Sequence, residues 1–412
     1  MCQFCVSLFL FTSYGWAQSV NNIPVTVEAQ DQILPQSIGV GDGVFVVWID
    51  SQTDGDQIQY MKLSPRGVPD STTLGSISFT GERIGSFDID SNSDESFYVA
   101  WAGESSDRSS IRVMKLDASG QQVWDKPTYL TESEFNFREP HITDDLDGGC
   151  YVVWQRSSTA GGDDPNDIDL YAQQLGEKGA TTWNQNAVII NKNGQQIFGD
   201  VTALRTALVV AWQDGNTVRL GAYNRNDGNA VSDQDGIAPG TGFIMRNPQI
   251  IHVKSNATTI QNEVIVVWEQ AGFLNINKEV YAQKMNIDGD RLWGSAGERV
   301  ATNSNDPRSP QIVNDEQQGV IIVWQEHRNP SRGIYAQRFD EDGNRLWSNS
   351  GIELTGENAY DAKFHIAHDN QQGVYLTWED AQNGDLDVWA QYVKGDESLP
   401  WGEKCIVVSQ HG

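Results

Sequence analysis

The sequence is short of basic residues, and this shortage excludes several kinds of partner. Its 28 lysines and arginines stand against 56 aspartates and glutamates, so the net charge is −28. A nucleic-acid backbone or an anionic membrane surface would repel such a chain. The sequence also lacks an apolar run long enough to cross a bilayer. We therefore expect neither nucleic-acid binding nor membrane insertion.

Cysteine is scarce as well, and the 4 that are present do not suggest a disulfide framework. The first two fall in an apolar segment that ends in Gly-Trp-Ala, which is typical of a secretory signal peptide over residues 1–17. Residues 18–412 would then form one exported domain, secreted from the cell or held on the bacterial cell surface. Cys150 stands where related segments have valine, so we expect it to be a buried apolar residue that does not pair with Cys405.

The common catalytic and cofactor-binding motifs are also absent from the sequence. It contains no Ser/His/Asp order with an elbow glycine, no His-Glu-x-x-His, no Cys-x-x-Cys and no glycine-rich phosphate loop. We therefore expect a protein that is not an enzyme and that holds no organic cofactor.

The dominant feature that is present is a short apolar strand written seven times. Gly319-Val-Ile-Ile-Val-Trp-Gln-Glu326 is the clearest copy, and the copies lie 53 to 58 residues apart. A strand with one wet face alternates apolar and polar residues, whereas this one is apolar throughout and is expected to be buried on both faces. Each copy ends in a tryptophan that we expect to be a buried structural residue: Trp48, Trp101, Trp154, Trp212, Trp268, Trp324 and Trp378.

Three further strand signals recur around each copy. In the best-preserved repeat they are residues 310–313, 333–339 and 351–355, with an Asp-Gly-Asn hairpin signal before a second tryptophan, Trp347. Seven repeats of four antiparallel strands predict an all-β, seven-bladed β-propeller, because blades packed face to face bury the second strand on both sides. A linear β-solenoid and two stacked sandwiches are the alternatives that the seven-fold count disfavours.

The repeat Ile334-Tyr-Ala-Gln-Arg-Phe-Asp-x-x-Gly-x-x-Leu-Trp347, preceded by Gly-x-x-x-x-Trp-Gln-Glu326, resembles the repeats of secreted bacterial β-propellers. These repeats are common on exported and surface proteins, often of bacteria that use the type IX secretion route. The resemblance covers essentially the whole mature chain. It implies the propeller fold and an extracellular location, but little about function, because the motif residues are structural.

Every repeat carries a polar residue about 13 places before its buried tryptophan. At the start of an innermost strand these side chains would surround the mouth of a central channel. Two interpretations remain open: they hydrogen-bond the backbone of the adjacent blade, or they hold a polar ligand or cation on the axis. The seven members of this axial polar ring are Gln36, Asp88, His141, Asp200, Gln249, Gln311 and His365.

Acidic turns raise the question of Ca²⁺ binding. Most of them occupy positions where a hairpin turn is already expected, and they are too short for an EF-type loop. The loop of residues 161–169 is longer and carries four carboxylates. It is the candidate surface Ca²⁺ site, formed by Asp163, Asp164, Asp167 and Asp169.

Loops that link second to third strands, and one blade to the next, are longer and more varied than the other links. Variable loops on a rigid scaffold are where binding specificity lies. Phe135, Phe137, Phe243 and Phe273 in these loops predict an exposed, adhesive surface. We therefore predict an extracellular or cell-surface module that binds envelope proteins, other extracellular proteins, glycans or further copies of itself. The alternative is a glycan-active hydrolase or lyase on a propeller scaffold.

The chain offers eight candidates for seven outer strands. Residues 23–28 precede the first repeat and residues 404–409 follow the last, in the same register. The C-terminal segment is the better candidate for the last blade, because Trp401 precedes it as in other repeats. The remaining segment is expected to pair elsewhere in the ring or with a neighbouring molecule, since an unpaired apolar strand invites aggregation.

Overall fold

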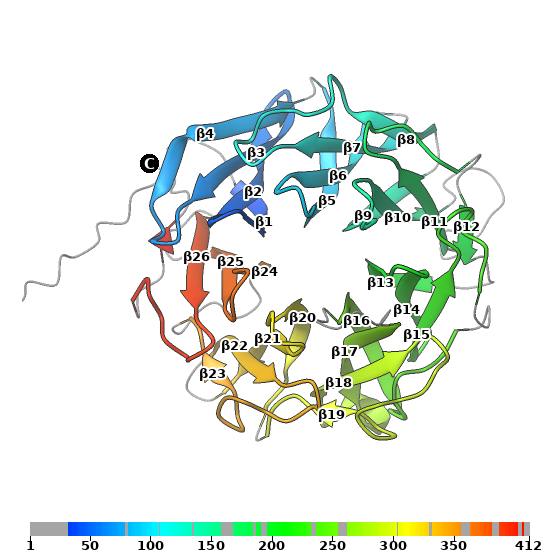
Figure 1. Cartoon of the computed structure of the whole chain (residues 1–412), viewed down its shortest axis with the longest axis vertical. Helices are drawn as coiled ribbons and strands as arrows, with labels where there is room; N and C mark the ends of the chain where they lie inside the picture. Colours follow the sequence, from blue (N-terminus) through cyan, green and yellow to red (C-terminus); the bar gives the residue numbers. More distant parts are fainter. Residues whose placement is uncertain are drawn as a thin grey trace, which may run out of the picture.

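The computed structural model is a ring of seven antiparallel sheets around a central axis, and Figure 1 shows it along that axis. The predicted seven-bladed β-propeller is confirmed. The only helix among the described residues is one 3₁₀ turn, η1 (Phe273–Asn275), so nothing helical there could span a membrane. The structure describes residues 32–78, 81–106, 108–133, 136–157, 168–183, 187–190, 196–231, 236–253, 262–302, 304–328, 332–355, 363–380, 387–402 and 406–407.

Each blade is built from strands that follow one another in the chain, from the axis outward. The innermost strands are β1 (Gln32–Val40), β5 (Arg83–Ser91), β9 (Asn136–Asp144), β13 (Gln196–Ala203), β16 (Ile244–His252), β20 (Arg308–Asn314) and β24 (Phe364–His368). The second strands are β2 (Gly43–Gln52), β6 (Phe97–Glu104), β10 (Cys150–Ser157), β14 (Leu208–Asp214), β17 (Glu263–Ala271), β21 (Val320–His327) and β25 (Val374–Asp380). The third strands are β3 (Gly55–Leu63), β7 (Ser109–Leu116), β11 (Ile168–Leu175), β15 (Thr217–Tyr223), β18 (Glu279–Asn286), β22 (Arg332–Phe339) and β26 (Asp387–Val393).

The outer strands vary most in length. They are β4 (Pro69–Ser78), β8 (Thr128–Ser133), β12 (Ala187–Ile190), β19 (Glu298–Arg299), β23 (Ile352–Glu353) and β27 (Ile406–Val407). In the described part of blade 4 the outer position is reduced to a bridge, in which Leu220 and Ile237 exchange two backbone hydrogen bonds. The third strand of this blade reads Val218-Arg-Leu-Gly-Ala-Tyr223 and lacks the Tyr-Ala-Gln motif, so its shorter edge is consistent with its sequence.

The second strands are apolar because each lies between two neighbouring blades. The seven tryptophans that end the apolar runs of these strands, two to four residues before each strand ends, are all 2% exposed or less. In blade 6 the ring of Trp324 stacks on Tyr335 of the third strand, with 6.3 Å between ring centroids. Cys150, at the start of β10, is buried and unpaired. The tyrosine of the Tyr-Ala-Gln motif thus covers the tryptophan from the outer side of the sheet.

Five of the seven repeats have a second tryptophan, and it joins one blade to the next. Trp347 Nε1 donates to the carbonyl of Gly395 in blade 7 at 3.0 Å. Gln337, the buried glutamine of the Tyr-Ala-Gln motif, accepts from Trp347 N at 3.1 Å and donates to Ser348 O at 2.6 Å. The equivalent tryptophan-to-carbonyl bonds join Trp124 to Glu177, Trp183 to Arg225, Trp293 to Glu341 and Trp401 to Pro65.

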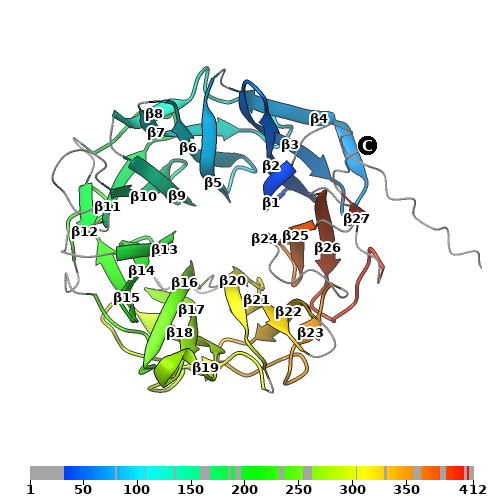
Figure 2. The ribbon, with the colours of Figure 1, turned by 180° about the vertical axis from the view of Figure 1, so that it is seen from behind.

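The last of these bonds closes the ring between blades 7 and 1. Strand β27 pairs with β26 through Ile406 and Val407, in the outer position that the C-terminal segment was predicted to fill (Figure 2). Every sheet of the described residues consists of consecutive strands, so none of them combines the two ends of the chain. The predicted signal peptide (1–17) and the strand candidate 23–28 lie outside the described residues.

The antiparallel order defines two faces of the ring. Links between first and second strands, and between third and fourth, emerge on one side, which we call the hairpin face. Links between second and third strands, and between blades, emerge on the other, which we call the loop face. The axial polar ring lies near the middle of the innermost strands and not at their start, as the sequence had suggested: Gln36 is the fifth of nine residues in β1, and His141 is the sixth of nine in β9. The ring therefore lines the channel itself and not its mouth.

Candidate functional site

The axial polar ring is positioned by irregularities in the innermost strands. Six of these strands carry a β-bulge or register shift shortly before the ring residue. In blade 5 the shift lies between Arg246 and Gln249, and Asn247 has a φ of 51°. Bulges re-aim the side chain that follows them. The ring side chains are therefore directed toward the innermost strand of the neighbouring blade.

Six of the seven ring side chains hydrogen-bond the backbone of an adjacent blade. The innermost strands are sheet edges, and their free backbone groups need partners when buried. These bonds agree with the first interpretation of the ring, in which its side chains hydrogen-bond the backbone of the adjacent blade. They join Gln36 Nε2 to Phe87 O, Ile142 N to Asp88, Ile250 N to Asp200, Gln249 Nε2 to Gly199 O, Gln311 Nε2 to Phe364 O and Ser37 N to His365 Nδ1.

His141 is the seventh member, and it lies between two carboxylates. Its Nδ1 is 3.6 Å from Asp88 Oδ2 and 3.7 Å from Asp200 Oδ1, so one imidazole links blades 2, 3 and 4. Burial alone would lower the pKa of His141, but the contact with Asp200 and the negative charge of Asp88 raise it to about 9. His141 is therefore an imidazolium at neutral pH.

Two more aspartates lie further along the same innermost strands. Asp90 is two residues after Asp88 in β5, and Asp144 is three residues after His141 in β9. Asp90 accepts the backbone N–H of Asp144 at 2.9 Å. Burial raises the pKa of Asp90 to about 6, and burial together with the charge of Asp90 raises the pKa of Asp144 to about 7. With these pKa values the two carboxyl groups gain or lose a proton near neutral pH, as a general acid or base in a catalytic site must.

The opposite side of the axis is less charged. Burial lowers the pKa of His365 to about 4. Its Nδ1 accepts the backbone N–H of Ser37 at 3.1 Å, so the neutral ring carries its proton on Nε2. The axial cavity has a volume of about 600 Å³, with acidic groups on blades 2 to 4. The other blades contribute apolar and amide groups such as Ile251 and Gln311, together with His252 of blade 5 and Lys363, His365 and His368 of blade 7.

Metal binding has no geometric support in the described part of the chain. No group of three or more His, Cys, Asp or Glu among the described residues is arranged to hold an ion. Asp163, Asp164 and Asp167 of the candidate Ca²⁺ loop lie outside the described residues. Asp169 lies in β11, where it pairs across the sheet with Arg156 of β10.

The loop face carries an exposed apolar cluster, which we call the loop-face patch. Phe243 precedes β16, and η1 follows β17, so two separate links meet there. The rings of Phe243 and Phe273 meet edge to face, with 5.5 Å between centroids. The members and their exposures are Phe243 (62%), Phe273 (65%), Leu274 (75%) and Ile276 (57%).

The sequence-based prediction for this face is therefore correct in part. Phe243 and Phe273 are exposed as expected. The prediction for Phe137 is wrong: it is 4% exposed in β9, where the strand starts earlier than the loop pattern suggests. Phe135 lies outside the described residues. Leu274 and Ile276 were missed, although the Phe-Leu-Asn-Ile run between two strand signals could have identified them.

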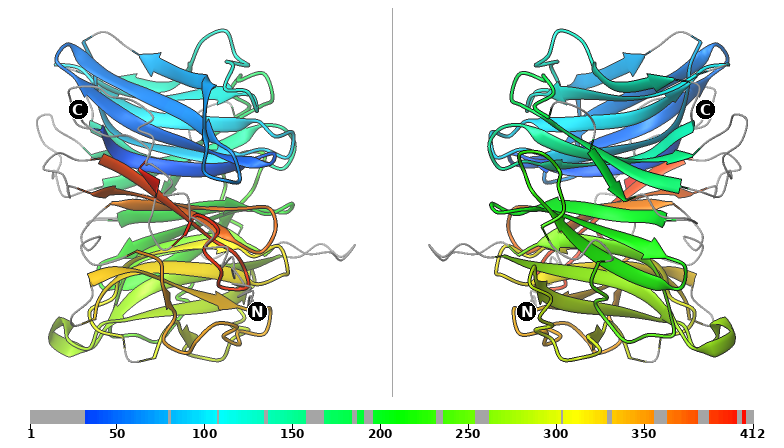
Figure 3. Two further views of the ribbon diagram at one scale, coloured as in Figure 1. Left: turned by 90° about the vertical axis from the view of Figure 1, so that its left-hand side faces the viewer. Right: turned by 90° about the vertical axis from the view of Figure 1, so that its right-hand side faces the viewer.

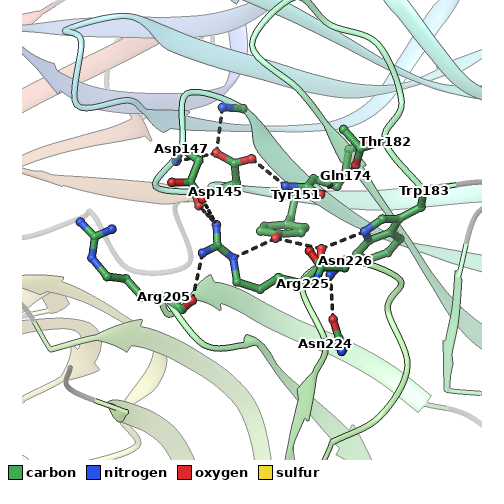
Figure 4. Close-up of polar contacts among 11 residues, drawn as sticks. Asp145, Asp147, Tyr151, Gln174, Thr182, Trp183, Arg205, Asn224, Arg225 and Asn226 are labelled. Atoms are coloured by element: carbon green, nitrogen blue, oxygen red, sulfur yellow. Dashed lines mark hydrogen bonds and ion pairs between the residues drawn. The ribbon is translucent and has the colours of Figure 1, made fainter.

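A second polar cluster lies on the hairpin face between blades 3 and 4 (Figure 4). Arg225 donates to Tyr151 Oη at 3.1 Å, to Asp147 Oδ2 at 2.7 Å and to the carbonyl of Arg205 at 3.0 Å. Trp183 Nε1 donates to the carbonyl of Arg225 at 2.9 Å. Because Arg225 directs its donors to the protein itself, this cluster is an inter-blade contact.

Comparisons with known proteins identify the class of fold. No protein-family model and no curated protein sequence matches the chain. An ulvan lyase of polysaccharide lyase family PL25 superimposes with a TM-score of 0.55 at 9% identity, covering 92% of this chain and 97% of its own. The β-propeller domain of the Trilobed protease from Pyrococcus furiosus, described as having an open velcro topology, gives 0.50 at 9% identity, covering 93% and 99%.

A prolyl endopeptidase also superimposes, with a TM-score of 0.50 at 9% identity over 93% of this chain. The chain spans about half of that protein, 51% of its length. At these identities the likenesses show a shared fold and nothing about activity. The chain is therefore a β-propeller of seven blades, and its function has to be argued from its own surface.

Proposed function

We propose that the protein is an extracellular or cell-surface binding and assembly module that engages a protein or glycan partner through the loop face. The loop-face patch is the observation that carries this proposal. The largest exposed apolar cluster of a soluble protein is often a binding site. The axial polar ring offers less for binding, because six of its seven side chains already hydrogen-bond neighbouring blades.

The test compares partner capture by matched variants. Wild-type protein, Phe273→Ser and Leu346→Ser are immobilised and exposed to an envelope extract of the native source and to a glycan array. Leu346 is 48% exposed on the hairpin face, so its variant controls for the loss of an exposed apolar residue. We expect wild type and Leu346→Ser to retain the same partner and Phe273→Ser to lose it. Equal capture by all three, and by variants of other loop-face residues, would contradict the proposal.

Export is part of the same proposal. The apolar N-terminal segment and the resemblance to exported bacterial propellers support it. N-terminal sequencing of the protein recovered from the native source should begin at Gln18. A protein that retains residues 1–17 would contradict cleavage of a signal peptide.

A glycan-active enzyme is the second candidate, and one observation favours it. Asp88, Asp90 and Asp144 line a cavity of about 600 Å³, and their pKa values are raised to about 6, 6 and 7. Carboxyl groups with such values in a cavity are candidates for acid–base catalysis. A screen of anionic and neutral polysaccharides decides the matter. Product formation by wild type that is lost in Asp144→Asn and in His141→Gln would establish the enzyme, and a blank screen would reject it.

A further inference from the structure

The loop-face patch is held in shape before any partner binds. Gly272 N donates to Ile276 O at 2.8 Å, and Asn275 N donates to Gly272 O at 3.1 Å, so the loop is closed on itself. Arg246 Nη2 donates to Asn275 Oδ1 at 3.1 Å and ties the loop to β16. Figure 3 shows η1 standing out at one edge of the disc. A fixed loop loses little conformational entropy on binding, which favours affinity.

The backbone of this loop is also strained. Leu274 has a φ of 64°, and Asn275 and Asn277 have φ values of 59° and 53°. Leucine at positive φ is unfavourable, because its Cβ approaches the following carbonyl oxygen. The loop thus holds an exposed leucine in an unfavourable conformation. Neither the exposure nor the strain stabilises the free protein, which points to a use in binding.

Basic residues border the patch in a chain that is otherwise strongly acidic. Lys278 Nζ lies 2.6 Å from Asp306 Oδ1, and Arg308 Nη2 lies 2.5 Å from Asp306 Oδ2. With Arg246 these give three basic residues against Asp306 and Glu269. Glu279, next to Lys278 in the chain, is paired with Arg299 at 2.7 Å, so the border has four basic and three acidic residues. The border is therefore positive, whereas the whole chain carries −28.

We propose that the loop-face patch docks a protein partner that presents an apolar pocket bordered by carboxylates. This inference rests on the proposed function and specifies its partner. Two phenylalanines, a leucine and an isoleucine anchor in an apolar pocket, and the positive border selects acidic residues around it. The four side chains of the patch itself are apolar, whereas a glycan presents mainly hydroxyl groups, so the patch suits a protein pocket better. The net charge of −28 opposes an anionic bilayer.

The size of the patch argues against a second copy as the occupant. Four partly exposed side chains offer on the order of 400 Å², below the roughly 800 Å² that each partner buries in a stable complex. The flanking surface must therefore take part in the interface. A second copy would bring the same positive border against this one, and like charges repel across an interface. An acidic partner lacks this conflict.

The test uses a displayed library of random 12-residue peptides, selected on the full mature chain. Enriched peptides are then titrated against wild type, Phe273→Ser, Arg246→Gln and Leu346→Ser by fluorescence anisotropy. We expect enriched peptides to combine aromatic or aliphatic residues with Asp and Glu. Affinity should fall at least tenfold in Phe273→Ser and several-fold in Arg246→Gln, with a weaker salt dependence in the latter. Leu346→Ser should match wild type.

Several outcomes would overturn the inference. The enriched peptides could be basic, or the selection could yield no peptide whose binding depends on Phe273. The protein could bind vesicles of phosphatidylcholine and phosphatidylglycerol through Phe273, or it could form a dimer in sedimentation that Phe273→Ser abolishes. Failure of the proposed function is distinguishable. If the native partner still binds Phe273→Ser but is lost on changing another loop-face residue, only the inference fails. If no loop-face change affects the partner, both fail.

Discussion

Asp144 and Asp90 show how a residue's place in the ring sets its chemistry. Both lie on innermost strands, where burial disfavours the charged carboxylate. The charge of Asp88 further raises the pKa of Asp90, and the charge of Asp90 further raises the pKa of Asp144. His141, three residues before Asp144 in β9, is instead favoured in its charged form, because two carboxylates flank it. The axis thus holds groups that gain or lose protons across the pH range from about 6 to about 9.

The Asp144→Asn variant tests this account through the pH dependence of stability. The folded-state pKa of Asp144 is about 7, above its ordinary value of 3.8. Its contribution to stability is therefore full below pH 4 and is lost as the pH rises through 7. We expect Asp144→Asn to match wild type at pH 4 and to exceed it at pH 8 by on the order of 1–2 kcal/mol, a value reduced for solvent screening.

Thermal unfolding between pH 4 and pH 8 measures the effect, and Asp125→Asn provides an exposed control that should show no such trend. A wild-type protein whose advantage over Asp144→Asn grows with pH would contradict the raised pKa.

At the scale of the element, the residues of the repeat motif make contacts between strands and between blades. The tryptophan of the second strand fills the space between sheets, and the Tyr-Ala-Gln strand supplies a ring to stack on it and an amide to hold the next turn. The second tryptophan then bonds the following blade. This explains why the motif predicts the fold and carries little information about function.

The Trp324→Ala and Gln337→Leu variants separate these two roles. Trp324 is 0% exposed, so its removal leaves a cavity and should cost about 3–5 kcal/mol. Gln337→Leu keeps the volume but leaves Trp347 N and Ser348 O without the side-chain partner, which should cost about 1–3 kcal/mol. Urea unfolding gives both values. A larger loss for Gln337→Leu than for Trp324→Ala would contradict this assignment.

The sequence predicted these elements well because their signals are local and repeated seven times. The buried tryptophans, the C-terminal strand β27 and the polar ring were all placed by counting from one repeat to the next. Phe137 was misplaced because the start of β9 depends on contacts with the neighbouring blade, such as Phe137 N donating to Ser109 Oγ. The raised pKa values of Asp90 and Asp144 also depend on burial by several blades, and the sequence of a single segment does not show this burial.

For the whole molecule, closure of the ring is the feature that remains least determined by sequence. Blades 1 and 7 share an apolar cluster that includes Val46, Trp48, Tyr375 and Trp401. Ser37 N donates to His365 Nδ1 across the same seam. These contacts close the ring without a strand from the other end of the chain among the described residues. The outer-strand pattern of residues 23–28 therefore has no assigned place.

Deletion of residues 19–30 tests what that segment does. We expect a lower melting temperature with unchanged molecular mass, because an additional paired strand would strengthen the closure. Calorimetry and light scattering on the deleted and full mature chains give both quantities. Loss of a higher oligomer would instead show that the segment pairs with a neighbouring molecule. No change in either quantity would contradict a structural role.

The central claim is that binding lies on the loop-face patch while the axial polar ring holds the blades together. One isothermal titration of a selected peptide against wild type, Phe273→Ser and Gln311→Ala, with the melting temperature of each, tests both halves. We predict that Phe273→Ser raises the Kd at least tenfold, about 1.4 kcal/mol, with an unchanged melting temperature. Gln311→Ala should lower the melting temperature and leave the Kd within about twofold, because Gln311 bonds Phe364 O and Ile366 N. A Kd that rises in Gln311→Ala and not in Phe273→Ser would contradict the account.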